Sequence, residues 1–418
     1  MKILILNESD IEGGAARAAG RLHDALLKRG ADAKMLVQLK KGDHPAVIGP
    51  TKGGKLIASL RPKLDTYPLH LWYKTDRLQL FSPAWMRDSV GARVRGIAPD
   101  LVHLHWLNNG FVRPESLAGM GRPLVWTLHD MWPFTGGCHY DGECGRYREG
   151  CGRCPQLSSA KDRDLSVRIL ERKRKAYQGL PLTIVTPSRW LAECARASAL
   201  FRNLRVEVIP NGLDLERYRP MDKAVARDIL GIPRDKDIIL FGAMSVDDKR
   251  KGFQHLQPAL RKLSAHPAAR NTELVVFGSG RPASPPDLGL PIRYLGRLHD
   301  DISLSLLYAA ADVFVSPSVQ DNLPNTVMEA MACGTPCVSF RIGGMEDMID
   351  HGRNGWLAAP FDAGELADGM LKVISEKQRC REFSLDARRK AESLWGLERF
   401  AKNHLDLYSD LIKARAPA

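Results

Sequence analysis

The sequence lacks any apolar run that approaches the roughly 18 residues needed for a membrane-spanning helix. We expect no secretory signal, because Glu8 and Asp10 interrupt the N-terminal apolar stretch and no small-residue cleavage site follows. We expect this stretch to form a buried first strand and the protein to stay in the cytoplasm. Thiols remain reduced there, so a cluster of cysteines favours a metal site over a disulfide.

Acidic residues are fewer than basic ones, and the formal net charge is +13. Such a charge suits nucleic acid, an anionic membrane or phosphate-bearing substrates. The densest basic run, RILERKRKAY at 168–177, is interpreted either as a solvated helix face or as a peripheral contact with anionic lipid on the inner face of the plasma membrane. Aromatic residues are not interleaved with its charges, which disfavours single-stranded nucleic acid. The charges concerned are Arg172, Lys173, Arg174 and Lys175.

Short apolar runs alternate with helical patterns along the whole chain, and no short repeat is present. Runs that are apolar throughout and alternate with helices predict an α/β protein with parallel, doubly wound sheets covered on both faces. The predicted strands are 2–7, 33–38, 100–106, 123–129, 182–188, 237–243, 273–280, 292–298 and 313–318.

The pattern restarts near residue 206, which predicts two Rossmann-like domains. The first is expected at 1–205 and the second at 206–385. Terminal helices at 386–418 are expected to pack back on the first domain. Two sheet domains of this kind predict a cleft between them, with ligands at the carboxyl ends of the strands.

Glycines and cations follow two of the predicted strands. Gly13 and Gly14 begin the first helix, where backbone amides and the helix dipole favour an anion, although a glycine before a helix is more often a simple turn. In the second half Lys249, Arg250 and Lys251 stand beside a glycine at a helix start. Three cations and backbone amides at one place indicate a diphosphate site.

Two carboxylates follow the strand at 313–318. Asp321 lies in the loop, and Glu329 lies one to two turns into the next helix. The apolar neighbours of Glu329, among them Met328 and Ala330, disfavour a merely solvated charge. We expect both carboxylates to face one pocket and to accept hydrogen bonds from sugar hydroxyls.

Several motifs together resemble glycosyltransferase family 4, whose members are retaining, nucleotide-sugar-dependent enzymes of the two-domain GT-B fold. These motifs are VIPNGLDLERYRP (208–220), KRKGF (249–253), DNLPNTVMEAMACGTPCVSF (321–340) and GGMEDMIDHGRNGWL (343–357). In the first half, GGAARAAGRLHDALLKRG (13–30) and WTLHDMWPFTGGCHY (126–140) are similar to the WcaC-like colanic acid branch, which builds bacterial exopolysaccharides.

The resemblance implies a catalytic set and a donor-binding set. His129 matches the active-site histidine near the donor sugar, Lys251 the cation that neutralises the leaving diphosphate, and Glu329 the carboxylate that binds the ribose. Asp321 matches the first carboxylate of the family's pair, which binds sugar hydroxyls. The remaining donor-binding positions implied by the resemblance are Gly13, Gly14, Lys249, Arg250, Asn322 and Leu323.

The chain departs from the family pattern at three positions: Ala243 where many members have arginine, Asp321 where they have glutamate, and Pro324 where they often have glycine. These differences bear on the identity of the donor sugar more than on the reaction. No DxD motif stands in a suitable loop, so catalysis is expected to need no metal, with preorganised cations stabilising the leaving diphosphate. Segment 65–86 is expected to recognise a saccharide acceptor. Its aromatic residues are interpreted either as facing a lipid-linked acceptor or as packing within the domain.

Three other functions remain open at this point. One is a nucleotide-sugar epimerase, phosphorylase or hydrolase on the same fold, and another is an inert homologue. The third is a zinc-containing nucleic-acid-binding protein, suggested by the charge and by Cys138, Cys144, Cys151 and Cys154. Their spacing, C-x5-C-x6-C-x2-C, ends in a pair typical of a metal site but begins wider than usual. Structural zinc, with His139 as an alternative ligand, competes with free thiols and with a disulfide.

Overall fold

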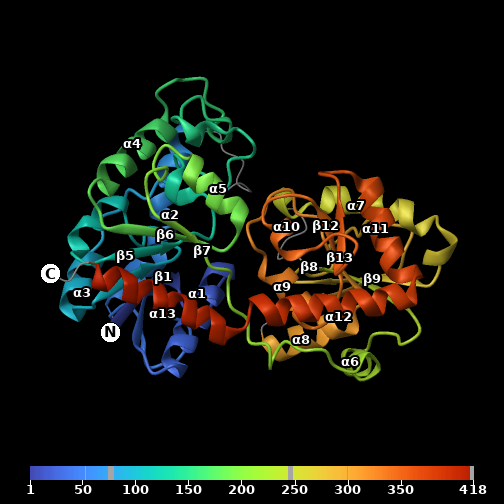
Figure 1. Cartoon of the computed structure of the whole chain (residues 1–418). Coiled ribbons are helices and arrows are strands. Elements are labelled where there is room, and N and C mark those ends of the chain that lie inside the picture. Colours follow the sequence, from blue (N-terminus) through green and yellow to red (C-terminus); the bar gives the residue numbers. More distant parts are fainter. Residues whose placement is uncertain (52, 74–79, 243–247, 299, 415–418) are drawn as a thin grey trace. The chain divides into compact units, whose positions relative to one another are not determined.

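A computed structural model describes residues 1–51, 53–73, 80–242, 248–298 and 300–414. Ala243 and part of the predicted acceptor segment, 74–79, lie outside these residues. The chain divides into two compact units (Figure 1). Unit 1 comprises Met1–Gly212 and Leu397–Ala418, and unit 2 comprises Leu213–Gly396.

Unit 1 is built on a parallel sheet in the order β3-β2-β1-β4-β5-β6-β7. Alternate residues of β1 enter opposite cores: Ile3 and Ile5 face one side of the sheet, and Leu4 and Leu6 face the other. All four are fully buried, as a strand covered on both faces requires. The strands are β1 (Lys2–Ser9), β2 (Asp32–Leu39), β3 (Val47–Ile48), β4 (Leu101–Leu104), β5 (Leu124–Thr127), β6 (Leu182–Thr186) and β7 (Val206–Val208).

Helices cover both faces of this sheet. On one side α1 (Gly14–Lys28) buries a stripe that includes Leu22 and Leu26, and α13 (Leu397–Lys413) packs beside it. The other core takes residues from α3 (Val90–Ile97), α4 (Leu165–Tyr177) and α5 (Arg189–Ala197). Helix α2 (Gly54–Trp72) is the remaining α-helix of this unit among the described residues.

Unit 2 repeats the plan with the parallel order β10-β9-β8-β11-β12-β13. Its strands are β8 (Asp237–Gly242), β9 (Thr272–Phe277), β10 (Ile292–Gly296), β11 (Val313–Ser316), β12 (Cys337–Phe340) and β13 (Gly355–Ala358). Its α-helices are α6 (Lys223–Leu230), α7 (Phe253–Ser264), α8 (Asp301–Ala310), α9 (Asn325–Ala332), α10 (Met345–Met348), α11 (Ala363–Ser375) and α12 (Lys377–Leu394).

The predicted doubly wound α/β architecture is confirmed. Each predicted strand exists, although several end earlier than expected: the run 100–106 gives a strand only over Leu101–Leu104. Helix α2 was not predicted, because Pro62 and Pro68 lie inside it and each removes an amide from the helical ladder.

The interpretation of the basic run as a solvated helix face is wrong for Lys173, and Arg172 is half-buried. Lys173 is fully buried and donates hydrogen bonds to the carbonyl oxygens of Trp132 and Thr135. Arg172 donates to both carboxylate oxygens of Glu115, at 2.7 and 3.0 Å. These contacts join α4 to other parts of unit 1, and a sequence pattern carries no sign of them.

Candidate active site

In unit 2 the three predicted cations form a short turn, η6 (Lys249–Lys251), between β8 and α7. Gly252 follows with a φ of 74°, and a Cβ added there would stand 1.7 Å from the carbonyl oxygen of Pro317. Val319 donates to the carbonyl oxygen of Arg250 at 2.9 Å. Glycine therefore allows the cationic turn to lie directly against the loop that follows β11.

We expect Gly252→Ala to destabilise the protein more than Gly231→Ala does. Both glycines have positive φ, but a Cβ at Gly231 would meet nothing within 4 Å. The control substitution should therefore cost only the left-handed backbone penalty of about 1–2 kcal/mol. Gly252→Ala adds the collision with Pro317. Urea unfolding of both variants measures the difference, and equal losses would contradict the packing described here.

Asp321 is the centre of an ionic cluster. Its Oδ2 accepts a hydrogen bond from Lys251 Nζ at 2.8 Å and lies 3.3 Å from Arg250 Nη1. Burial favours the neutral acid, but the charges of Lys251 and Arg250 outweigh burial and hold the pKa of Asp321 below its ordinary value. Asp321 is therefore ionised at neutral pH, and it positions both cations.

The backbone around Asp321 is fixed by a second close approach. A Cβ on Gly343, which has a φ of 52°, would stand 2.0 Å from the Asp321 carbonyl oxygen. Gly344 donates its amide to the same oxygen at 3.2 Å. Asn322 and Leu323 follow as buried residues in this held loop. The predicted donor-binding loop is thus rigidly supported within unit 2.

Glu329 is buried in α9, and only 2% of its surface is exposed. It accepts a hydrogen bond from the Tyr308 hydroxyl at 3.2 Å. Asp321 therefore contacts η6, whereas Glu329 contacts α8. Their meeting at one sugar nucleotide stays a prediction.

In unit 1 His129 lies just beyond β5 and is half-buried. Its Nε2 is 2.9 Å from Nδ1 of His105, a residue just beyond the neighbouring strand β4. Burial lowers the pKa of His129 to about 4. The imidazole is thus neutral at physiological pH and can exchange hydrogen bonds with a ligand but cannot supply positive charge.

His105 is the site residue that the sequence interpretation missed. The pattern HLHW contained the signal, since His103 lies in β4, which pairs with the strand leading to His129, and His105 follows just beyond the end of β4. Asp130, the next residue after His129, contacts other side chains. Its carboxylate accepts hydrogen bonds from His139 Nδ1 at 2.7 Å and from the Trp106 indole at 2.9 Å.

The two glycines of the predicted anion loop lie at the start of α1. Gly13 is the N-cap residue with a φ of 87°, and an added Cβ would meet nothing within 4 Å. The conformation, not space, therefore favours glycine there. No acidic side chain occupies the first turn of α1, so the helix dipole at Gly13 and Gly14 is not offset by a carboxylate on that turn.

The four cysteines of the 138–154 segment line one small cavity of unit 1.

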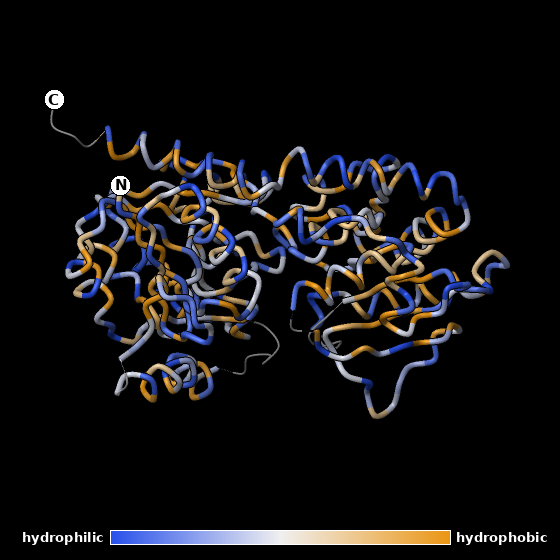
Figure 2. The backbone as a smooth tube through the Cα atoms, turned by 90° about the horizontal axis from the view of Figure 1, so that it is seen from below, coloured by the Kyte–Doolittle hydropathy of each residue, from blue (hydrophilic) through white to orange (hydrophobic). Residues whose placement is uncertain are grey.

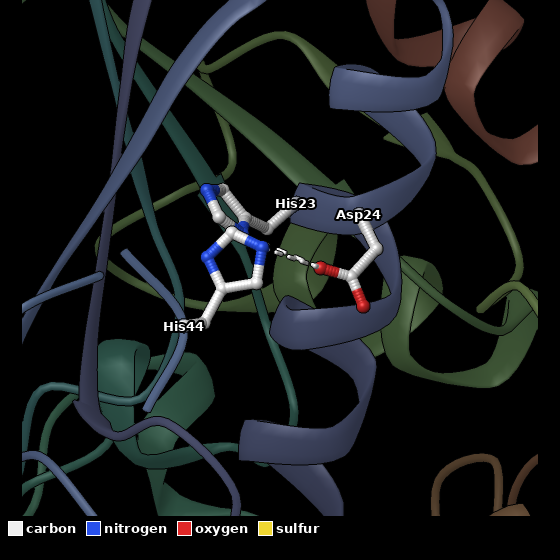
Figure 3. Close-up of side chains that lie close together, drawn as sticks. All are labelled: His23, Asp24 and His44. Carbon is white, nitrogen blue, oxygen red and sulfur yellow. Dashed lines mark ion pairs between the residues drawn. The ribbon is translucent and has the colours of Figure 1, made fainter. Parts of the chain in front are cut away.

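The described residues also contain a group that was not predicted, in which ligand atoms of His23, Asp24 and His44 lie within 4.8 Å of one another (Figure 3). Its closest nitrogen–carboxylate separations are 3.6 and 3.9 Å, and the Asp24 and His44 side chains are 57% and 42% exposed. We interpret this group as a loose surface ion pair and assign it no metal.

Comparison with known protein families matches both halves of the chain. The family Glycosyltransferase Family 4 matches residues 12–217, and the family Glycosyl transferases group 1 matches residues 235–376. D-inositol 3-phosphate glycosyltransferase 2 of Catenulispora acidiphila is 32% identical over 75% of this chain and 71% of its own length. The putative colanic acid biosynthesis glycosyl transferase WcaC of Escherichia coli is 26% identical over 81% of this chain and 83% of its own.

Solved structures support the same fold. Anabaena Alr3699/HepE, crystallised in complex with UDP and glucose, superposes with a TM-score of 0.63 at 19% identity, over 98% of this chain and 99% of that one. The GT-B architecture predicted from the motifs is thereby confirmed. No described helix is both long and apolar enough to span a bilayer.

Proposed function

The chain belongs to the family 4 glycosyltransferases, and on that premise we propose that it is a retaining hexosyltransferase. The proposed donor is a nucleoside diphosphate sugar, and the proposed acceptor is a lipid-linked saccharide. The product would be part of a bacterial exopolysaccharide. The observation that carries the proposal is the cationic turn Lys249–Lys251, held by Asp321 and Gly252 at the carboxyl end of β8.

The chemistry follows from where charge develops. The bond between the sugar and the diphosphate breaks, leaving negative charge on the phosphate oxygens and positive charge on the sugar ring. Lys251 and Arg250 are fixed before the reaction, so they can stabilise the leaving group without reorganisation. The acceptor hydroxyl bonds to the sugar on the face that the phosphate leaves and gives its proton to that phosphate, which retains the configuration. No step in this scheme needs a metal.

A thermal-shift panel of UDP, GDP and their sugars tests the donor class. A ligand at a hundred times its dissociation constant stabilises the protein by about 2.7 kcal/mol. We expect UDP and UDP-glucose to act, since HepE was crystallised with UDP and glucose. No response to any nucleotide would contradict the proposal. An epimerase or hydrolase would instead convert the donor without an acceptor.

Two variants test the roles of the carboxylates separately. Glu329→Gln should weaken the response to UDP and to UDP-sugar alike, because the proposed partner of Glu329 is the ribose. Asp321→Asn should remove the additional gain from the sugar and should also alter the response to UDP itself, because Asp321 positions the two cations proposed to bind the diphosphate. Acceptor assays should include lipid-linked saccharides and D-inositol 3-phosphate, the compound that gives the Catenulispora acidiphila relative its name.

We further propose that α2 docks this enzyme on an anionic bilayer. The apolar face of α2, defined as Leu56, Leu60, Leu64, Tyr67 and Leu71, follows helical spacing and is 45–71% exposed. Figure 2 shows the helix at the periphery of unit 1, with hydrophobic residues along it.

Charge complementarity supports a lipid partner. The only acidic residue of α2 is Asp65, which is buried, whereas Lys55 and Lys63 are exposed. Trp85, 46% exposed, donates its indole N–H to the Asp65 carbonyl oxygen at 3.0 Å and so stands beside the helix. Apolar side chains with flanking lysines and an interfacial tryptophan are typical of helices that lie in a membrane surface.

Flotation of the full chain with vesicles tests the docking surface. Binding is expected with phosphatidylglycerol–phosphatidylcholine vesicles and should be lost in Leu60→Ser/Leu64→Ser. The matched control Ile229→Ser/Leu385→Ser changes two residues of unit 2 with 63% and 57% exposure and should bind normally. Absence of binding, or equal loss in the control, would reject α2 as the docking surface.

A further inference from the structure

The chain between β5 and α4 is long and irregular. From residue 128 to residue 164 it contains only the short turns η3 (Trp132–Phe134), η4 (Arg146–Arg148) and η5 (Pro155–Leu157). A segment of this length without strands or α-helices is uncommon inside a compact domain. Its Met131, Trp132, Phe134 and Tyr147 belong to one core of unit 1. Its Cys138, Cys154 and Leu157 form a separate small cluster with Leu69, Phe81 and Ile169.

Four thiols converge in this segment. Cys138, Cys144, Cys151 and Cys154 come from different parts of it, yet all line the same cavity, whose volume is about 20 Å³. A cavity of 10–15 Å³ or more can hold a water-sized particle. All four cysteines are free in the structure, with Cys138 and Cys154 buried. The remaining cysteines of the chain take no part in this cavity.

Backbone amides are directed at two of the sulfurs. The amide of Gly136 lies near the Cys151 sulfur, and the amides of Gln156 and Leu157 lie near the Cys154 sulfur. Amides near a sulfur favour the thiolate, which is the form that binds a metal.

Cations stand close to the same sulfurs. The buried Lys173 ammonium donates to the carbonyl oxygens of Trp132 and Thr135 in the same segment. Arg146 lines the cavity and donates to the Arg153 carbonyl oxygen at 2.9 Å. Four thiolates around a divalent ion carry two net negative charges, which these two cations offset.

We propose that Cys138, Cys144, Cys151 and Cys154 bind one zinc ion in a closed, structural site. Each thiol gives up its proton to solvent as its sulfur binds the ion. Thiolate ligands favour zinc among the common divalent ions, and Zn–S bonds of about 2.3 Å require the sulfurs to move inward. In the described part of the chain, no three of these sulfurs lie within 4.8 Å of one another. Binding therefore contracts the cavity.

The zinc site positions the histidine network without taking part in sugar transfer. His139 follows Cys138 directly and donates from Nδ1 to Asp130 at 2.7 Å, and its Nε2 lies 2.9 Å from the Ser82 hydroxyl. Asp130 is the next residue after His129. A closed four-thiolate site has no open position for substrate, so its effect on His129 is mechanical.

Metal analysis of the full chain, purified without chelator, tests the site. We expect about one zinc per chain in the unmodified protein and in Cys380→Ser, which changes a cysteine of unit 2. We expect Cys151→Ser and Cys154→Ser to lose the metal. Growth with cobalt in place of zinc should give the visible absorption of tetrahedral cobalt–thiolate, a measurement that depends on no variant.

Each result decides the proposal. A metal-free protein in which these four cysteines are free thiols would overturn it, as would a disulfide between any two of them found by mass spectrometry without reduction. Zinc retained at full content in both cluster variants would place the ion elsewhere, for example at His23 and His44, and would also overturn it. The assay measures metal content and not transfer, so its outcome is independent of the proposed enzymatic activity.

Discussion

Replacing Lys251 with alanine is expected to reduce kcat for sugar transfer by about 10²–10³-fold, the usual cost of removing one preorganised group that stabilises developing negative charge. The ammonium is held 2.8 Å from Asp321 before any ligand arrives. An ammonium has three hydrogens, so it can keep this bond and still donate to a phosphate oxygen. Steady-state kinetics with the donor identified by thermal shift measures the loss.

Lys249→Ala is the matched control, because Lys249 belongs to the same turn but is exposed. We expect it to change kcat less than tenfold. Lys251→Arg should be more active than Lys251→Ala but less active than the unmodified enzyme. Arginine keeps the positive charge, but its planar guanidinium cannot take the place of the compact ammonium. If Lys249→Ala and Lys251→Ala lose activity equally, the turn acts through its net charge, and the specific role of Lys251 is wrong.

Much of the fold could be predicted because its strands are buried on both faces. Runs such as KILILN and ELVVFG have no polar face, and glycine turns separate them from helices. Strand ends were less predictable: His105 and His129 follow their strands with apolar neighbours and resemble strand residues in the sequence. Helix α2 was missed because its prolines oppose a helix and because its apolar face is exposed among the residues that the structure describes.

The parts of the site that lie within one sequence motif were predictable. KRKGF placed three cations beside a glycine, and the structure adds that this glycine lies against Pro317. The ion pairs of Lys251 and Arg250 with Asp321 join residues about seventy positions apart, and no local pattern contains them. For the same reason the sequence could not show that Asp130 binds His139.

A buried histidine cluster predicts a strong dependence of stability on pH. His404 on α13 has Nδ1 2.9 Å from the Phe400 carbonyl oxygen, which can only accept, so Nδ1 carries the proton. Its Nε2 is buried and has no hydrogen-bond partner among the residues that the structure describes. Protonation there would create an unpaired buried charge, and burial accordingly lowers the pKa of His404 to about 4. The pKa values of His103 and His105 are lowered for the same reason.

The free energy of unfolding should therefore fall as the pH is lowered through the window from about 6.5 to about 4. Within this window the unfolded chain binds a proton at His404 and the folded protein does not, which favours unfolding at lower pH. A shift of this size amounts to about 3 kcal/mol, of which about 2 kcal/mol is lost between about pH 7 and pH 5. Urea unfolding of the full chain at the two pH values measures the difference.

His404→Gln keeps a donor for Phe400 but cannot titrate, so its loss of stability between the two pH values should be smaller by about 2 kcal/mol. His70→Gln, which changes an exposed histidine of unit 1, should leave the pH dependence unchanged. Should both variants keep the full dependence, the charge that acid creates lies outside the contact of α13 with the sheet.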